Sequence, residues 1–331
     1  MKTIVVAGAS AGVGRAVAEA FAGPDRHVAL IARNRDRLEA AARAVRAAGG
    51  SASVHLLDLA DWSAVDAAAR EIDAAHGPID VWVNAAMVTV LSTVEETTPD
   101  EYRRVSEVTY LGTVHGTKAA LERMAARDRG VIVQIGSALA YRSVPLQSAY
   151  CGAKAAARGF TDSLRSELIR RKSGIRLTAV QLPAVNTPQF DWARNRFGHK
   201  AQPIPPIFQP ERIAQAVVRA AERPRREYWL GWPATKAILG TRVLPGLGDR
   251  ILASEAWEGQ FTDEAETPGR PDNLMDSVAR DVGARGRFDD RATMRSPFMW
   301  LEERIGLAPL FLAVVAVGAA AVVAGIVALA F

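Results

Sequence analysis

The sequence of 331 residues contains a single cysteine, Cys151, and therefore cannot form an internal disulfide. A cysteine-rich metal site is excluded for the same reason, and we expect Cys151 to be a small packing residue. The histidines are scattered and show no metal-ligand spacing: His27, His55, His76, His115 and His199. No run of Lys and Arg interleaved with aromatic residues occurs, and the net charge is only +5. We therefore expect no metal and no nucleic-acid partner.

Charge is missing altogether from the C-terminal stretch, residues 305–331. A helix of this length would measure about 40 Å, whereas a bilayer core needs only about 30 Å. A buried core helix is usually shorter and keeps a polar face. The sequence therefore predicts a single transmembrane helix over 305–331.

The N-terminus begins with Met1 and Lys2, followed by a short apolar run that glycines interrupt. We interpret this run as a buried strand and not as a signal peptide. The part of the chain before the helix is then expected in the cytoplasm, with the helix spanning the inner (cytoplasmic) membrane once. Arg291, Arg295 and Arg304 precede the apolar stretch, as the positive-inside rule requires for this orientation.

Short apolar runs alternate with helical stretches along the first two thirds of the chain. This alternation predicts βαβ units and a doubly wound parallel α/β sheet, the Rossmann fold. Strands are expected at 3–7, 27–32, 53–57, 79–84, 131–135 and 176–181, and helices include 34–48, 61–75, 99–126 and 148–171. The interval 99–126 fits one long helix or two merged ones.

The amino-acid composition changes after Leu182, where the regular alternation of strands and helices ends. Residues 183–210 hold six prolines and predict a loop or a lid, and residues 262–297 predict an irregular linker to the anchor. We divide the chain into a catalytic domain at 1–231, a helical or irregular extension at 232–304 and the membrane helix at 305–331. Residues 194–250 carry 11 basic and 4 acidic side chains, which is compatible with docking on anionic lipid.

Glycines follow the first predicted strand and precede a helix. A pyrophosphate needs a close backbone approach and free N–H groups at a helix N-terminus, which glycines permit. The candidate cofactor-binding residues of this turn are Gly8, Ser10, Gly12, Val13 and Gly14.

The end of the second predicted strand favours NADP(H) over NAD(H). Arg33 stands where NAD enzymes usually place an acid, and its guanidinium can bind a 2′-phosphate. Arg35 and Arg37 are weaker candidates for the same task, and all three could instead be a solvated first helical turn. Asp58, with Leu59 beside it, follows the third strand and is placed to accept from the adenine amino group.

The ordered motifs over residues 1–231 resemble those of the short-chain dehydrogenase/reductase family. The motifs are the glycine turn with Ala7 in the usual Thr position, Asn84-Ala85-Ala86 after the fourth strand, Ser137, Tyr150 with Lys154, and the run from Pro183 to Thr187. The resemblance implies that Asn84, Ala85, Pro183 and Thr187 help to bind the cofactor. It also implies a homodimer formed through the helices at 99–126 and 148–171.

Tyr150 and Lys154 are four residues apart and share one helix face. A nearby ammonium lowers the pKa of a phenol, so we expect Tyr150 to exchange a proton with a carbonyl or alcohol oxygen. Ser137 would hydrogen-bond the same oxygen, and the resemblance gives Lys154 the nicotinamide ribose as a second partner. The family usually has a catalytic Asn where this sequence has Thr109, so the role of Thr109 is open.

The sequence thus predicts an NADP(H)-dependent oxidoreductase that interconverts a carbonyl and an alcohol. The membrane helix and the aromatic loop residues Phe190, Trp192 and Phe197 suggest a lipophilic substrate, although these three could equally be lid packing. The alternative is a membrane-tethered nucleotide-binding scaffold with little turnover. Thr109 favours this alternative, and the intact Ser137, Tyr150 and Lys154 set argues against it.

Overall fold

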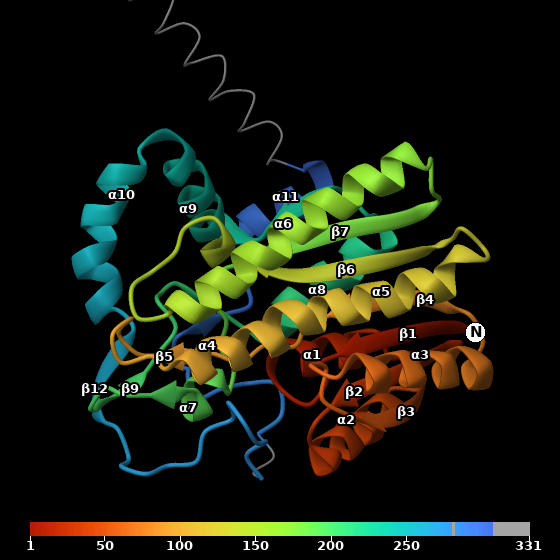
Figure 1. The fold of residues 1–331 in the computed structure, drawn as a ribbon, viewed down its shortest axis with the longest axis horizontal. Helices are drawn as coiled ribbons and strands as arrows, with labels where there is room; N and C mark the ends of the chain where they lie inside the picture. The colour runs from red at the N-terminus through yellow and green to blue at the C-terminus, as the bar shows by residue number, and fades with distance from the viewer. Residues whose placement is uncertain (280–281, 307–331) are drawn as a thin grey trace, which may run out of the picture.

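The computed structural model describes residues 1–279 and 282–306 (Figure 1). Its centre is a seven-stranded parallel sheet in the order β11-β7-β6-β4-β1-β2-β3. The strands are β1 (Lys2–Ala7), β2 (Arg26–Ala32), β3 (Ser51–Leu56), β4 (Ile79–Asn84), β6 (Gly130–Ser137), β7 (Ile175–Leu182) and β11 (Glu227–Trp229). From β1 the chain adds β2 and β3 on one side, and it then crosses back to add β4, β6, β7 and β11 on the other side. The strand order therefore switches between β1 and β4, and doubly wound sheets bind ligands at such a switch point. The predicted fold class is confirmed.

Helices cover both faces of the sheet because its strands are apolar on both sides. One face packs against α1 (Gly12–Ala20), α2 (Arg35–Ala47) and α8 (Pro210–Glu222). The other packs against α3 (Trp62–His76), α5 (Gly112–Ala125) and α6 (Ser148–Arg170). The predicted helix at 99–126 is α4 (Pro99–Val105) joined to α5 through a π-helical segment, η1 (Ser106–Leu111), which contains Thr109.

Most of the remaining elements gather beyond the carboxyl ends of the sheet strands, on the left of Figure 1, whereas α11 lies at the top beside α8, α9 and β11. They are β5 (Val90–Leu91), the 3₁₀ turn η2 (Ala138–Ala140), α7 (Gln189–Trp192), β8 (Arg194–Asn195), β9 (His199–Ala201), β10 (Ile207–Phe208), α9 (Gly231–Val243), α10 (Pro245–Ile251), the π-helical turn η3 (Leu252–Ala256), β12 (Phe261–Ala265), β13 (Ala292–Thr293) and α11 (Pro297–Ile305).

Residues 262–297 do not form the linker that their composition predicts. They are mostly irregular, but β12 pairs with β9 and β13 pairs with β10. Leu274 and Phe288 are buried, and the Asn186 side chain donates to the Asp289 carboxylate at 2.9 Å. Gly, Pro and Asp predict irregular backbone correctly, but they do not reveal that its polar groups pair with the 183–210 loop.

Within the described residues, no helix is long and apolar enough to cross a membrane. The predicted transmembrane helix lies outside the described residues, except for Ile305 and Gly306. It therefore stays a prediction.

Candidate active site

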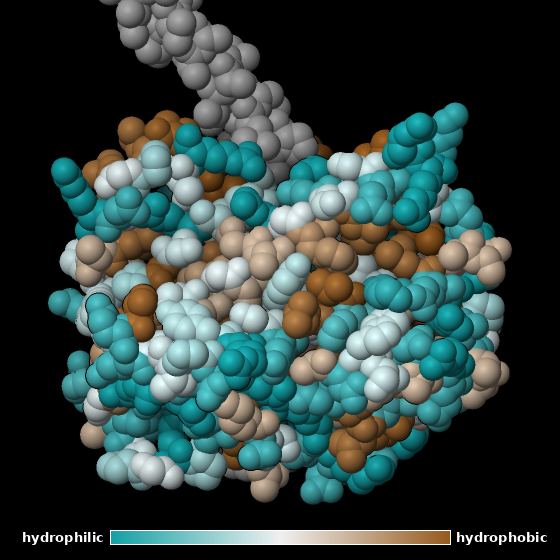
Figure 2. All heavy atoms as spheres, viewed as in Figure 1, coloured by the Kyte–Doolittle hydropathy of each residue, from teal (hydrophilic) through white to brown (hydrophobic). Residues whose placement is uncertain are grey.

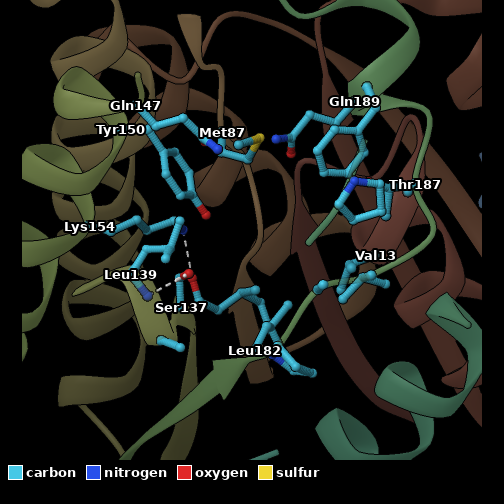
Figure 3. Close-up of a pocket in the computed structure, with 18 of the residues that line it drawn as sticks. Val13, Met87, Ser137, Leu139, Gln147, Tyr150, Lys154, Leu182, Thr187 and Gln189 are labelled. Atoms are coloured by element: carbon cyan, nitrogen blue, oxygen red, sulfur yellow. Dashed lines mark hydrogen bonds between the residues drawn. The ribbon is translucent and has the colours of Figure 1, made fainter. Parts of the chain in front are cut away.

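A cavity of about 900 Å³ opens at the carboxyl ends of the central strands (Figure 3). Its size suits a dinucleotide together with a substrate. The predicted residues that line it are Gly8, Ser10, Gly12, Val13, Gly14, Arg33, Asp58, Leu59, Ala85, Ser137, Tyr150, Lys154, Pro183 and Thr187. Chain segments from both the catalytic domain and the extension enclose this single space. Among the described residues, no cluster of His, Cys, Asp or Glu is arranged to hold a metal ion.

The turn between β1 and α1 tolerates only glycine at two positions. Gly8 has φ +98°, and a Cβ there would lie 2.5 Å from the Ala86 amide nitrogen. A Cβ on Gly14 would lie 2.0 Å from the Gly8 carbonyl oxygen. The Ala11 side chain at the N-cap makes no capping hydrogen bond, and the first turn of α1 lines the cavity, although its Gly12 amide already donates to a backbone carbonyl. This geometry fits a pyrophosphate.

Ser137, Tyr150 and Lys154 form one wall of the cavity, and Val13 and Thr187 lie across the opening (Figure 3). Ser137 ends β6, and its Oγ accepts a hydrogen bond from the Leu139 amide at 3.1 Å. The Lys154 ammonium donates to the Ile135 carbonyl oxygen at 2.7 Å and lies 5.8 Å from the centre of the Tyr150 ring. The three predicted side chains therefore converge on one place.

The apolar surroundings of this wall set the protonation of Tyr150 and Lys154. Burial raises the pKa of the Tyr150 phenol above its ordinary value, and the neighbouring Ser137 hydroxyl offsets only part of that rise. Burial also lowers the pKa of Lys154 to about 8. The expectation that Lys154 lowers the pKa of Tyr150 is not met in this structure, because desolvation of the phenolate dominates. The Tyr150 phenol is therefore protonated at neutral pH.

Two predicted residues do not face the cavity. The Asn84 amide lies in a buried network, where it accepts from Trp82 Nε1 at 2.9 Å and donates to Thr117 Oγ1 at 3.0 Å. Thr109 is fully buried, and its hydroxyl both accepts from the Val88 amide and donates to the Val88 carbonyl. Asn84 thus holds β4 against α5, and Thr109 fixes the backbone at Val88, which does line the cavity.

Arg33 and Asp58 line the cavity at the end where the sequence places the adenosine. The Asp58 carboxylate forms an ion pair with Arg104 and lies 4.0 Å from Arg33. The Arg33 guanidinium donates to the carbonyl oxygens of Asn273 at 2.7 Å and Met275 at 2.6 Å. The extension therefore contributes to this end of the site, a contribution that the sequence analysis missed.

The other arginine candidates separate clearly in the structure. Arg37 lines the cavity and donates to the Val278 carbonyl, whereas Arg35 is exposed and does not line it. A fourth extension carbonyl, that of Gly283, accepts a hydrogen bond from the Gly12 amide at 3.2 Å. Backbone carbonyls of the extension thus accept hydrogen bonds from the glycine turn and from both Arg33 and Arg37.

Other lining residues carry no sequence signal because they are apolar or neutral. Met87, Leu139, Gln147 and Gln189 surround the opening in front of Tyr150 (Figure 3). The sequence left open whether the aromatic loop residues line a substrate pocket or only pack in a lid, and the structure shows both. Phe190 and Trp192 line the cavity, whereas Phe197 packs on Phe261 with ring centres 4.8 Å apart. Cys151 is buried against Val144 and Ala256, which confirms its packing role.

Comparison with known proteins agrees with this arrangement. The family model for short chain dehydrogenases matches residues 2–196. The chain is 28% identical over 297 residues to the uncharacterized oxidoreductase YxnA of Bacillus subtilis, covering 89% of this chain and 83% of that protein. It is 30% identical over 228 residues to a fatty acyl-CoA reductase of Acinetobacter baylyi, covering 68% and 75%.

A solved structure agrees as well. The alcohol dehydrogenase of the archaeon Thermococcus sibiricus, complexed with 5-hydroxy-NADP, superposes with a TM-score of 0.59 at 28% identity. The match covers 69% of this chain and 94% of that one. Since the family model spans more than half of the sequence, the chain belongs to the short-chain dehydrogenase/reductase family. It is an oxidoreductase of that family.

Proposed function

We propose that this protein interconverts a carbonyl and an alcohol with NADP(H), and that its substrate is lipophilic. The observation that carries the proposal is the placement of Ser137, Tyr150 and Lys154 on one wall of the cavity that also contains the glycine turn. The NADP-complexed alcohol dehydrogenase and the fatty acyl-CoA reductase among the similar proteins support the cofactor and the substrate class.

The described residues fit a dinucleotide. Glycine at positions 8 and 14 lets the turn pack closely against the backbone of Ala86 and of Gly8 itself. This packing places the N-terminus of α1 at the cavity, where its N–H groups would hold a pyrophosphate. Arg33 would hold the 2′-phosphate. Its guanidinium would give up its hydrogen bonds to the two neutral carbonyl oxygens of Asn273 and Met275 and bind the negatively charged phosphate more strongly. The bound dinucleotide would supply or accept the hydride.

Tyr150 acts as the general acid in the reducing direction, because its phenol is protonated at neutral pH and lies on the cavity wall beside Ser137 and Lys154. Ser137 donates a hydrogen bond to the same substrate oxygen and orients it. Lys154, held by the Ile135 carbonyl, binds the nicotinamide ribose with its remaining protons. Thr109 acts indirectly, by fixing Val88 in the cavity wall.

We further propose that residues 305–331 anchor the protein in the inner membrane, with the catalytic domain on the cytoplasmic side. The support is the absence of charge from this stretch and the arginines that precede it. A homodimer formed through α4, α5 and α6 remains part of the proposal, on the family resemblance alone.

The direct test is NADPH oxidation by the purified full-length protein in mild detergent. The panel should contain aldehydes and ketones of increasing chain length. We expect turnover that improves as the chain lengthens. Tight NADPH binding without turnover of any carbonyl or alcohol would instead favour the scaffold alternative.

A further inference from the structure

Exposed apolar side chains are concentrated on one part of the extension. Fifteen large apolar side chains are exposed among the described residues, and seven of them belong to α9, α10, the turn between these helices, and α11. We call these seven the apolar rim: Trp232, Val243, Leu244, Leu247, Ile251, Trp300 and Ile305. Figure 2 shows the part of the rim over the α9–α10 turn as a brown area at the upper left. A concentration of this kind marks an interaction surface.

The apolar rim is continuous with the mouth of the cavity. Leu244, Leu247 and Ile251 line the cavity, although they are 58%, 54% and 42% exposed, respectively. The same cavity reaches Tyr150 and Ser137. An apolar chain that contacts the rim from outside therefore reaches the same cavity that contains Tyr150.

The basic side chains of residues 194–250 are only partly available to meet anionic lipid. Six of its eleven basic side chains are paired with acidic residues of the same chain: Arg194, Arg196, Lys200, Arg212, Arg219 and Arg226. Three exposed basic residues of this interval, Lys236, Arg242 and Arg250, lie on α9 and α10. Positive charge is thus available beside the rim, where it would meet anionic headgroups.

The end of α11 indicates what the apolar rim contacts. Ile305 is 62% exposed and is the first residue of the uncharged stretch 305–331. α11 packs against α9 through Phe298 and Trp232, whose ring centres are 5.9 Å apart. Arg304 lies over the Trp300 ring at 4.4 Å, and Trp and Arg are residues that favour the membrane interface. The uncharged stretch 305–331 therefore begins at a residue of the apolar rim.

We propose that the apolar rim docks on the lipid bilayer, and that an acyl-chain aldehyde, ketone or alcohol enters the cavity from the bilayer between α9 and α10. The rim inserts its apolar side chains among the lipids as an interfacial surface does. The reacting carbon then lies beside Tyr150, and the acyl chain extends back through the mouth. The choice of substrate rests on the proposed function, whereas the docking does not.

Docking can be measured without turnover. The full-length protein is reconstituted in vesicles of mixed neutral and anionic phospholipid, with Val243→Cys carrying a small environment-sensitive fluorophore. Val94→Cys is the matched control, because Val94 is an exposed valine between β5 and α4, outside the rim and the proposed dimer helices. The native Cys151 is buried and should not label. We expect brominated lipid to quench the label at 243 at least threefold more than the label at 94. Equal quenching at the two sites would overturn the docking.

Two other ways of covering the apolar rim would also overturn the proposed docking on the bilayer. A second copy of the chain would shield the label at 243 in detergent, in a manner that depends on protein concentration. The apolar stretch 307–331 folded back on the rim would shield it in detergent at every concentration and leave it unquenched in vesicles.

Substrate entry is tested with variants of rim residues that do not line the cavity. We expect Val243→Glu combined with Trp300→Glu to raise the KM for a long-chain aldehyde dissolved in the vesicles about tenfold. Kinetics with a short water-soluble aldehyde should be unchanged, and Val94→Glu, at an exposed position that does not line the cavity, should change the KM for neither substrate. An equal rise for both substrates would contradict entry from the bilayer. Failure to turn over any aldehyde would refute the proposed function, while the quenching result would still stand.

Discussion

The Arg33 guanidinium donates a 2.6 Å hydrogen bond to the carbonyl oxygen of Met275, a residue 242 positions further along the chain. This contact joins the cofactor end of the sheet to the extension. The same guanidinium is the group that the sequence assigns to the 2′-phosphate. Cofactor choice and the position of the extension are therefore coupled at one side chain.

Replacing Arg33 with Ala should weaken NADPH binding and leave NADH binding nearly unchanged. A charge-assisted contact to phosphate contributes about 1.5–3 kcal/mol, so the ratio of the two dissociation constants should fall at least tenfold. Fluorescence titration with both cofactors measures this ratio. Arg35→Ala is the control, since Arg35 is exposed and does not line the cavity. Equal dissociation constants for NADPH and NADH in the unmodified protein would refute the assignment.

Replacing Tyr150 with Phe should remove turnover while NADPH still binds. The hydroxyl delivers the proton but is not needed to hold the dinucleotide, and a positioned general acid contributes about 10²–10⁴-fold in rate. Stopped-flow NADPH oxidation and a binding titration separate the two effects. Tyr110→Phe serves as the control, because Tyr110 does not line the cavity. A variant that keeps more than a tenth of the rate would show that another group is the acid.

Replacing Lys154 with Met should stabilise the cofactor-free protein at pH 7. The folded state lowers the pKa of Lys154 to about 8, below its ordinary value of 10.5. The buried ammonium therefore costs stability below pH 8, and this cost disappears as the pH rises towards 10.5. We expect a gain of roughly 1–3 kcal/mol at pH 6.5.

The pH dependence of this gain is the sharper test. Thermal unfolding at pH 6.5 and pH 10 should show the difference in Tm between the variant and the unmodified protein shrinking at the higher pH. Lys236→Met, at an exposed position, should show no such change. A constant difference at both pH values would mean that Lys154 is not charged and buried in the folded protein.

Deleting residues 305–331 should release the protein from membranes, with NADPH binding retained. Of the deleted residues, only Ile305 and Gly306 are described, and neither lines the cavity. The measurement is fractionation of both chains with an alkaline carbonate wash, followed by cofactor titration of the soluble form. Recovery of the full-length protein in the carbonate wash would exclude a membrane span.

The parts of the site that could be predicted from the sequence are those fixed by short-range rules. The glycine turn follows from one strand–helix junction, and Tyr150 and Lys154 share a helix face because they are four residues apart. Ser137 joins them because parallel strands end at the same edge of the sheet. Each of these inferences needs only local structure and the order of the elements.

The parts that could not be predicted depend on contacts between distant segments. Asn273, Met275 and Gly283 act through backbone carbonyls, so no residue type marks them. The raised pKa of Tyr150 follows from how deeply the phenol is enclosed, and spacing along a helix carries no information on that. Thr109 contacts Val88 from within the π-helical segment η1. No residue pattern in the sequence predicts this π-helical segment.

The extension holds the cofactor end of the cavity through its main chain, and this makes it tolerant of substitution but sensitive to length. Any residue at position 275 still presents a carbonyl oxygen to Arg33, provided that the backbone follows the same path. Inserting or deleting one residue close to position 275 would instead displace the carbonyl oxygens of Asn273 and Met275 from Arg33. Related chains should therefore vary freely at the exposed position 275, keep an apolar residue at the buried position 274, and keep the spacing between them.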